Sequence, residues 1–365
     1  MGKSIFFTCV VFLGFLFVVY IARLSFLTII QSKQLYSRIK TNTEGWGKQV
    51  HVADDLLGYV PIPNSKGFQG FDEKAVPVKY DKHGFRIPEK SLFDTKIKPP
   101  VVMALGCSHT FGAGISAEDT YVSIVAEKSG GVALNAGRCG YGLSQMLIVA
   151  REMIPAFKPD YVLVQYSPWL ATRATSYYGP TRYSKLPVPW FSDASDGFKL
   201  NKPLFSAAIF DVQFNKYRSA TKTTSEFLLF LWDIGFPLFV RDAYYSDLFF
   251  IKNRIGMLQS PTKSHEDLVA YVYHEFAKLA GDNNGQLYIV IIGRGVERHL
   301  TYSDTIKNID SAIVIDANEA LFGRLKNETL ESYASAYWTS ANDVHPNPNA
   351  HEVIAEEIVK AILYK

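Results

Sequence analysis

The sequence predicts an α/β fold with a parallel central sheet, preceded by one transmembrane helix at the amino terminus. Three observations support this prediction. The chain opens on an uncharged apolar stretch, short apolar segments alternate with helical patterns further along, and a glycine-rich turn follows the first of those segments. With 365 residues, 48% of them apolar and 20% charged, the chain can bury a sizeable core.

The opening stretch, residues 4–22, contains nineteen residues without a charge. This length crosses a hydrocarbon core of roughly 30 Å as a helix, so residues 1–30 are predicted to be a membrane anchor. A cleaved signal peptide and a buried core helix are the alternatives. No small-residue cleavage site follows, and apolar character resumes after Arg23 as LSFLTII. The basic residues between 23 and 40 favour a cytoplasmic position for the rest of the chain.

After the anchor we expect a polar linker at 31–53, a β-rich lead-in at 54–98 and an α/β domain at 99–365. Helical patterns lie between several apolar segments, which is typical of a parallel sheet covered on both faces. The predicted strands are 101–105, 131–135, 161–166, 286–292 and 312–315. The predicted helices are 120–128, 145–157, 266–280 and 350–363.

An aromatic-rich insertion at 167–260 interrupts this alternation and is too long to be a plain loop. Its segment 226–240 is apolar but contains Asp233, Gly235 and Pro237. We therefore predict a buried or membrane-surface helix pair there, not a second span. Aromatic residues such as Trp190 and the cluster at 177–183 are candidates for stacking on sugars or covering an acyl chain, although core packing is their more common role.

Composition and motifs argue against a nucleic-acid partner, a disulfide framework and a bound metal or other cofactor. The net charge is +3 and no dense basic stripe is visible, so nucleic acid is not an expected partner. The three cysteines form no disulfide framework. No metal-ligand spacing and no phosphate-binding GxxxxGK loop is present, so we expect neither a metal nor another cofactor.

The turn GCSHTFGAG, residues 106–114, follows the first strand of the α/β domain. Because ligands of open α/β sheets bind beyond the carboxyl ends of the strands, Ser108 is a candidate nucleophile. A helix N-cap is the alternative role for this serine. Cys107 should point toward the sheet instead, and His109 is a candidate pocket or structural residue.

A serine needs a base, and the base needs an orienting group. The segment NDVHPNPNAH near the carboxyl terminus supplies His345 with Asp343 two residues before it. We predict that His345 is the base and Asp343 its orienting acid. The alternative is that Asp343 and Asn347 are turn and cap residues. His351, one turn into the last helix, is a weaker candidate for the base.

Together these motifs resemble the blocks of the SGNH (GDSL-type) hydrolases. GCSHTFGAG is similar to GDSxTxG with Cys107 in place of aspartate, LNAGRCGYG at 134–142 resembles the second block, and HPN resembles the last. The lead-in stretches LLGYVPIPN and HGFR are similar to those of bacterial membrane-anchored members. The resemblance implies a three-layer flavodoxin-like SGNH hydrolase fold and an oxyanion hole formed by the N–H groups of Ser108 and Gly140.

The sequence departs from the family pattern at two places. The third block has Trp169 where the family has an asparagine, and an indole has a single N–H donor. Ser167, Arg173 and Asn318 are possible substitutes, and Trp169 and His109 are candidate substrate contacts. In the last block, the aspartate of many members stands three residues before the histidine, a position held by Asn342.

We therefore expect a membrane-anchored serine esterase or O-acyltransferase acting on an ester of a glycan or lipid. A catalytically inert SGNH-like binding or assembly module is the main alternative. A plain flavodoxin-like domain, with Ser108 as a helix cap, is the third. Family members with such anchors usually face the periplasm or the outer side, which the resemblance favours over the charge pattern. The oligomeric state is not predicted.

Overall fold

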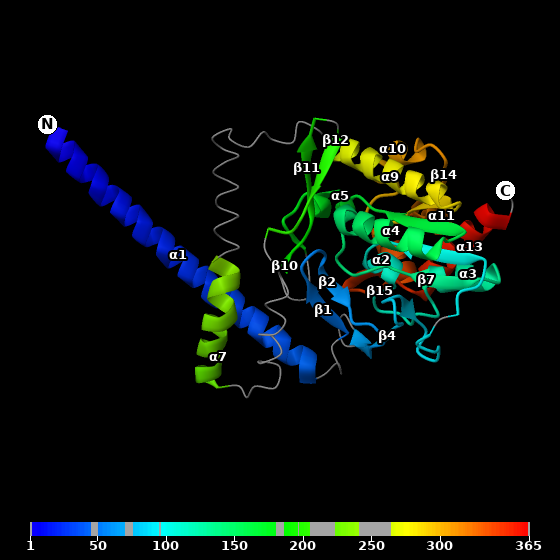
Figure 1. The fold of residues 1–365 in the computed structure, drawn as a ribbon, viewed down its shortest axis with the longest axis horizontal. Coiled ribbons are helices and arrows are strands. Elements are labelled where there is room, and N and C mark those ends of the chain that lie inside the picture. The colour runs from blue at the N-terminus through cyan, green and yellow to red at the C-terminus, as the bar shows by residue number, and fades with distance from the viewer. Residues whose placement is uncertain are drawn as a thin grey trace. The chain divides into compact units, whose positions relative to one another are not determined.

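The computed structural model describes residues 2–44, 50–69, 76–94, 96–179, 186–195, 197–204, 223–240 and 264–363. It divides into two units. One unit contains residues 1–45 with 209–260, and the other contains residues 46–208 with 261–365. The second unit holds the sheet and the predicted site residues, and its elements are drawn in Figure 1.

The central sheet of the second unit has the strand order β14-β13-β8-β6-β7-β5-β4-β3. The first five strands in this order are mutually parallel, whereas β5, β4 and β3 join antiparallel. The bounds are β3 Lys66–Gln69, β4 Val76–Tyr80, β5 Arg86–Ile87, β6 Val101–Leu105, β7 Val132–Asn135, β8 Tyr161–Tyr166, β13 Gln286–Ile291 and β14 Ala312–Ile315. The five parallel strands match the five predicted ones.

The order of the parallel strands is that of flavodoxin-like folds, because the second strand in the chain lies outside the first and the third to fifth lie on its other side. The order reverses between β6 and β8. At this switch point the carboxyl ends of two neighbouring strands lead away to opposite faces of the sheet, which leaves room for a ligand.

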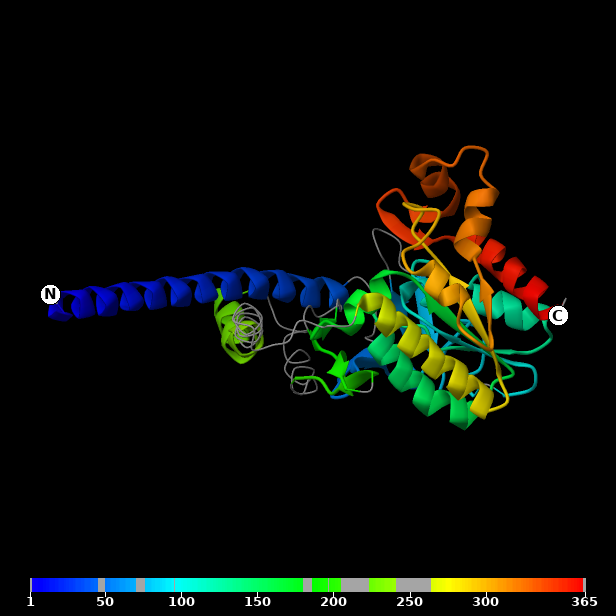
Figure 2. The same ribbon diagram turned by 90° about the horizontal axis from the view of Figure 1, so that it is seen from above.

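Helices cover both faces of the sheet, as the continuous apolar strands require. On one face α3, α11 and α13 pack on a core that includes Val102, Leu163 and Val290. On the other face α4 and α9 lie side by side, seen in green and yellow in Figure 2. The bounds are α3 Tyr121–Lys128, α4 Leu143–Phe157, α9 His265–Asp282, α11 Ala317–Gly323 and α13 Pro348–Leu363. The predicted three-layer α/β fold is confirmed.

Smaller elements complete the second unit. The hairpin β1–β2 spans the end of the expected linker and the start of the lead-in, and the hairpin β15–β16 contacts α2 and α13. The remaining bounds are β1 His51–Asp54, β2 Gly58–Pro61, α2 Ser108–Phe111, α5 Trp169–Ala174, β9 Tyr178–Gly179, β10 Leu186–Pro187, β11 Trp190–Ala194, β12 Gly197–Asn201, α10 Ser303–Lys307, α12 Leu330–Tyr337, β15 Trp338–Ser340 and β16 Asp343–Pro346.

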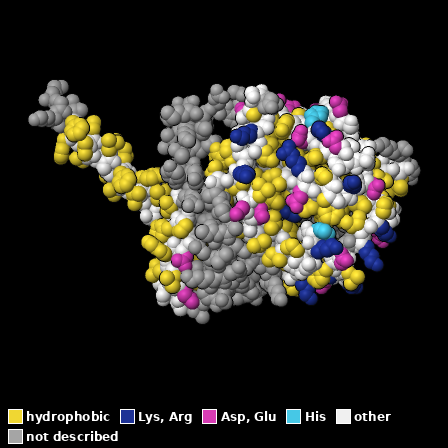
Figure 3. All heavy atoms as spheres, in the orientation of Figure 1, with side chains coloured by type: hydrophobic (Ala, Val, Ile, Leu, Met, Phe, Trp, Pro, Cys, Tyr) yellow, Lys and Arg dark blue, Asp and Glu magenta, His cyan; other side chains and the backbone are white. Residues whose placement is uncertain are grey.

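The first unit contains the long helix α1, Gly2–Glu44. Its segment Phe6–Lys33 is long and apolar enough to cross a membrane, and only 6% of its most apolar window is buried. Figure 3 shows the hydrophobic side chains along this helix. The helix extends to Glu44, so most of the expected linker at 31–53 is helical.

The insertion contributes α7, Thr224–Phe230, which continues as the π-helical segment η1, Leu231–Val240. The π-helical segment packs on α1, and both helices carry a small residue at the contact. A Cβ added at Gly235 would lie 2.2 Å from Ser32 Oγ. The segment at 226–240 is one continuous helical stretch, so the expectation of a helix pair there is wrong. Pro237 lies inside the π-helical part of this stretch.

Candidate active site

Ser108 is the first residue of the short helix α2, and two residues separate it from Leu105, the last residue of β6. It is buried, with 6% of its surface exposed. The turn needs a glycine before it, since a Cβ on Gly106 would lie 1.9 Å from Thr110 Oγ1. Gln165, near the end of β8, fixes the turn by accepting from the Cys107 N–H at 3.0 Å and from Thr110 Oγ1 at 2.8 Å. The turn therefore lies at the switch point between β6 and β8.

Asp343 and His345 lie on β16, and the imidazole Nδ1 forms a short hydrogen bond with Asp343 Oδ1. The same carboxylate oxygen accepts the backbone N–H of His345 at 3.2 Å. Burial of Asp343 would raise its pKa, but the hydrogen bonds from His345 and Thr339 outweigh this, and the pKa is lowered below its usual value. The predicted acid and base are thus a hydrogen-bonded pair in which the acid is ionised at neutral pH.

The turn and the pair lie on the same edge of the sheet. Helix α2 contacts β16, and the ring centroid of His109 lies 5.4 Å from that of His345. A Cβ added at Gly114 would lie 3.7 Å from Asp343 Oδ2, so the loop after α2 packs on the acid. The Ser108 hydroxyl points to Cys107 Sγ, 3.9 Å away.

The loop after β7 lies against the serine turn through a hydrogen bond from the Arg138 N–H to the Gly106 carbonyl at 3.1 Å. Gly140 in this loop has a φ of +84°, which favours glycine. Within the described part of the chain, neither the Ser108 N–H nor the Gly140 N–H donates to a protein acceptor. Both donors are therefore available to a ligand, as the predicted oxyanion hole needs.

Trp169 begins α5 and packs beside His109 of the serine turn, with its ring tilted and its centroid 5.1 Å from that of His109. Two of the possible substitutes for the missing asparagine are used elsewhere. Ser167 donates to the Ile292 carbonyl at 2.7 Å, and Asn318 donates to the carbonyls of Glu297 and Arg298. Arg173 remains, and donates through Nη1 to the Tyr141 carbonyl at 3.2 Å.

Cys107, which replaces the family's aspartate, faces the sheet as expected. Its Sγ accepts from Gln165 Nε2 at 3.2 Å, and the thiol is fully buried. Burial raises the pKa of this thiol, but Arg173, the His109 N–H, Trp169 and Gln165 together lower it below its usual value. Its contacts hold the turn in place on β8.

His351 is a structural residue. Its ring is buried in α13, stacks on Tyr121 at 5.6 Å and accepts the Tyr121 N–H on Nδ1 at 3.1 Å. Burial lowers its pKa to about 3, so it stays neutral. Asn347 caps α13 by accepting the Ala350 N–H at 3.0 Å, as the sequence alternative proposed for that residue.

Two arginines at the site were not identified in the sequence. Arg294 follows β13, and its guanidinium carbon lies 4.0 Å from the centroid of the Trp169 ring. The signal that could have identified it is a cation directly after the fourth parallel strand, at the edge where ligands bind. Nothing in the local pattern linked it to Trp169, which is 125 residues earlier.

The other is Arg86, on β5 of the lead-in, which is 3% exposed. Its guanidinium donates to the carbonyls of Phe111, Gly112 and Ile115, all in the segment that follows Ser108. It also lies 4.2 Å from the centroid of the Phe111 ring. The lead-in thereby holds the loop that connects the serine turn to the Asp343 side of the site.

Replacing Arg86 with alanine should lower the free energy of unfolding by about 3 kcal/mol or more, because three buried carbonyls lose their donor. Denaturant unfolding of the detergent-solubilised chain, followed by tryptophan fluorescence, measures this loss. Arg151→Ala is the matched control, since Arg151 forms only an exposed ion pair with Glu275. Equal midpoints for the two variants would contradict a structural role for Arg86.

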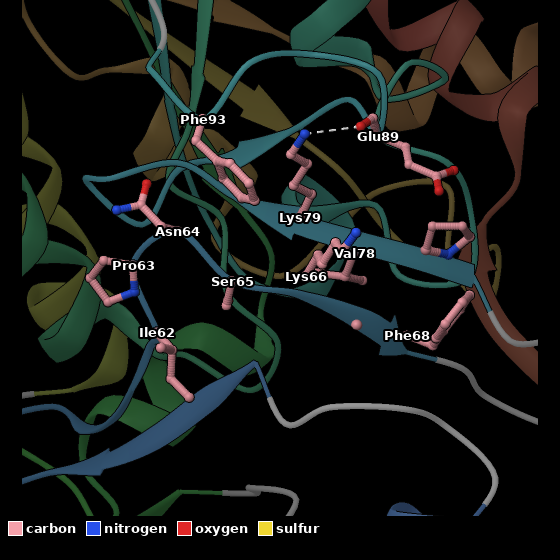
Figure 4. A pocket seen from close by; sticks show the side chains of 12 residues that line it. Ile62, Pro63, Asn64, Ser65, Lys66, Phe68, Val78, Lys79, Glu89 and Phe93 are labelled. Carbon is pink, nitrogen blue, oxygen red and sulfur yellow. Dashed lines mark hydrogen bonds between the residues drawn. The ribbon is translucent and has the colours of Figure 1, made fainter.

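A separate hollow of about 850 Å³ lies over β3, β4 and the segment leading to Phe93. Figure 4 shows Lys79 within it, donating to the Glu89 carbonyl at 3.1 Å. Ser108, Asp343 and His345 are not among its lining residues. This hollow is thus distinct from the predicted site.

No family model and no curated protein matches this chain. Solved structures with a similar fold include a lipolytic protein of the G-D-S-L family from Desulfitobacterium hafniense, at 11% identity and a TM-score of 0.35, covering 72% of this chain and 98% of that one. An acetylxylan esterase from Geobacillus stearothermophilus aligns at 12% identity and a TM-score of 0.38, covering 74% and 98%.

The esterase EstA from Pseudoalteromonas aligns at 11% identity and a TM-score of 0.35, covering 72% of this chain and 97% of that one.

Proposed function

We propose that this protein is a membrane-anchored serine hydrolase of the SGNH type. It would cleave an ester of a glycan or lipid, or transfer the acyl group of that ester to another hydroxyl. The single observation that supports it most is the Asp343–His345 hydrogen-bonded pair lying beside the turn that carries Ser108. The position of this turn at the switch point of the sheet, and the two N–H groups without protein acceptors, support it further.

In the proposed mechanism, Ser108 Oγ attacks the ester carbonyl carbon while His345 Nε2 takes the hydroxyl proton. Asp343 holds the imidazolium through Nδ1. The N–H groups of Ser108 and Gly140 bind the oxyanion. When the tetrahedral intermediate collapses, the alcohol leaves with the proton from His345, and the acyl group stays on Ser108.

A water molecule or a sugar hydroxyl then attacks the acyl-serine, again giving its proton to His345. The carboxylic acid or the new ester leaves, and Ser108 Oγ recovers the proton. Hydrolysis and acyl transfer share every residue of this scheme and differ only in the attacking oxygen.

The helix α1 would hold the protein in the membrane, with the catalytic unit on the periplasmic or outer side. A fluorophosphonate probe tests the nucleophile, since it phosphonylates only an activated serine. We expect one adduct, located on Ser108 by mass spectrometry. The same probe in a membrane-impermeant form should label the protein on intact cells if the unit faces outward, and only after lysis if it faces the cytoplasm.

The second candidate function is an inert SGNH-like binding module, which the tryptophan at the asparagine position favours. An inert module would leave Ser108 unlabelled in the purified protein. Labelling at a serine elsewhere in the chain would contradict the assignment of Ser108.

A further inference from the structure

Arg294 places a cation next to the residues that surround Ser108. Its guanidinium lies over Trp169, Trp169 lies beside His109, and His109 lies beside His345. The ring and cation distances along this series are 4.0, 5.1 and 5.4 Å. Arg294 is half-buried, and its Nε has no hydrogen-bond acceptor among the described residues.

Arg173 adds a second cation at the same site. It lies on α5 four residues after Trp169, so the two side chains share one face of the helix. Its Nη1 donates to the carbonyl of Tyr141, the residue after Gly140. Arg173 and Arg294 are therefore both placed next to Trp169, one on the same helix and the other 4.0 Å from its ring centroid. Consistent with this placement, burial and then the charge of Arg173 lower the pKa of Arg294.

Two more exposed arginines of the second unit, Arg298 and Arg324, differ in having carboxylate partners. Arg298, four residues after Arg294, pairs with Glu319 and Glu328. Arg324 pairs with Glu356 and Glu357. Neither Arg173 nor Arg294 forms an ion pair with any described acid. Two neighbouring, partly buried guanidinium groups repel each other and lose hydration, and both effects cost free energy unless an anion binds between them.

His109 supplies an independent observation at the same place. Its ring is fully buried, and neither ring nitrogen has a hydrogen-bond partner among the described residues. A buried imidazole without partners costs free energy, and such unsatisfied groups in a folded protein usually have a functional reason. A ligand bound between Trp169 and the serine turn would supply the hydrogen-bond partner that His109 lacks among the described residues.

We infer that Arg173 and Arg294 form an anion-binding subsite beside Ser108, and that the substrate ester carries a carboxylate or phosphate group. This inference rests on the proposed function and names its substrate class. Guanidinium forks match both groups because two parallel N–H donors meet two anionic oxygens. The subsite would hold the charged part of the ester while its carbonyl faces Ser108.

Equilibrium binding tests the subsite without requiring turnover. The full chain with Ser108→Ala is titrated calorimetrically with two matched pairs of esters: monomethyl and dimethyl succinate, and 1-acetylglycerol 3-phosphate and 1-acetylglycerol. We expect at least one anionic ester to bind about tenfold or more tightly than its neutral partner. The pair that shows the difference identifies the carboxylate or the phosphate as the preferred group.

Adding Arg294→Gln to the Ser108→Ala chain should remove that preference, and Arg298→Gln should leave it intact. Equal binding of the anionic and neutral esters, no binding of either anionic ester, or a preference that survives Arg294→Gln would overturn the subsite. Fluorophosphonate labelling of Ser108 in the unmodified chain is independent of these results. The hydrolase proposal can therefore stand when the subsite fails.

Discussion

Ser108→Ala is expected to reduce kcat/KM for 4-nitrophenyl acetate by about 1,000-fold or more, because no acyl-enzyme can form without the hydroxyl. The N–H groups of Ser108 and Gly140 would remain, so residual activity above the solvent rate is compatible with the mechanism. The side chain is small and the turn is fixed by Gln165, so the variant should fold normally.

Ser129→Ala is the matched control for this variant. Ser129 ends α3, where its hydroxyl donates only to the Ala126 carbonyl at 3.1 Å. Its rate should equal that of the unmodified protein. If Ser108→Ala hydrolyses the ester as fast as Ser129→Ala does, Ser108 is not the nucleophile and the acyl-serine mechanism fails.

Asp343→Asn should lower kcat by about 10,000-fold at neutral pH. An amide nitrogen facing Nδ1 would favour the tautomer with the proton on Nε2, and that tautomer cannot accept the proton of Ser108. Steady-state kinetics with 4-nitrophenyl acetate measure the effect. Asp310→Asn, at an exposed position, is the control and should retain full activity. A loss confined to KM would contradict an orienting role for Asp343.

The same substitution changes how stability depends on pH. The folded pKa of Asp343 is lower than its unfolded value of about 3.9, so its ionisation stabilises the fold fully above that value. The stabilisation disappears as the pH falls through the folded pKa. We therefore expect the difference in unfolding free energy between the unmodified protein and Asp343→Asn to shrink below about pH 4. A difference that is constant from pH 6 to pH 3 would contradict this linkage.

Much of the fold is encoded locally, which is why the sequence predicted it. Each parallel strand is a short apolar run bounded by turn residues, and each large helix has apolar residues at three- and four-residue spacing. The helix caps are also encoded locally: Thr120 caps α3 by accepting the Ser123 N–H, and Asn347 caps α13 by accepting the Ala350 N–H. The insertion was less predictable, because its helical segment is defined by packing on α1, more than 190 residues earlier in the chain.

The sequence by itself determined the parallel strands, the turn that holds Ser108 and the Asp343–His345 pair, because each depends on residues close together in the chain. Only the tertiary structure decided that Arg86 supports the serine loop and that Arg294 lies on Trp169. Those contacts join residues from 25 to 125 positions apart. Arg294 reaches Trp169 because parallel strands bring their carboxyl ends to one edge of the sheet. Arg86 reaches the same edge because it begins the antiparallel strand β5 and pairs with Asn135, the last residue of β7. No local periodicity in the sequence records which residues will face each other there.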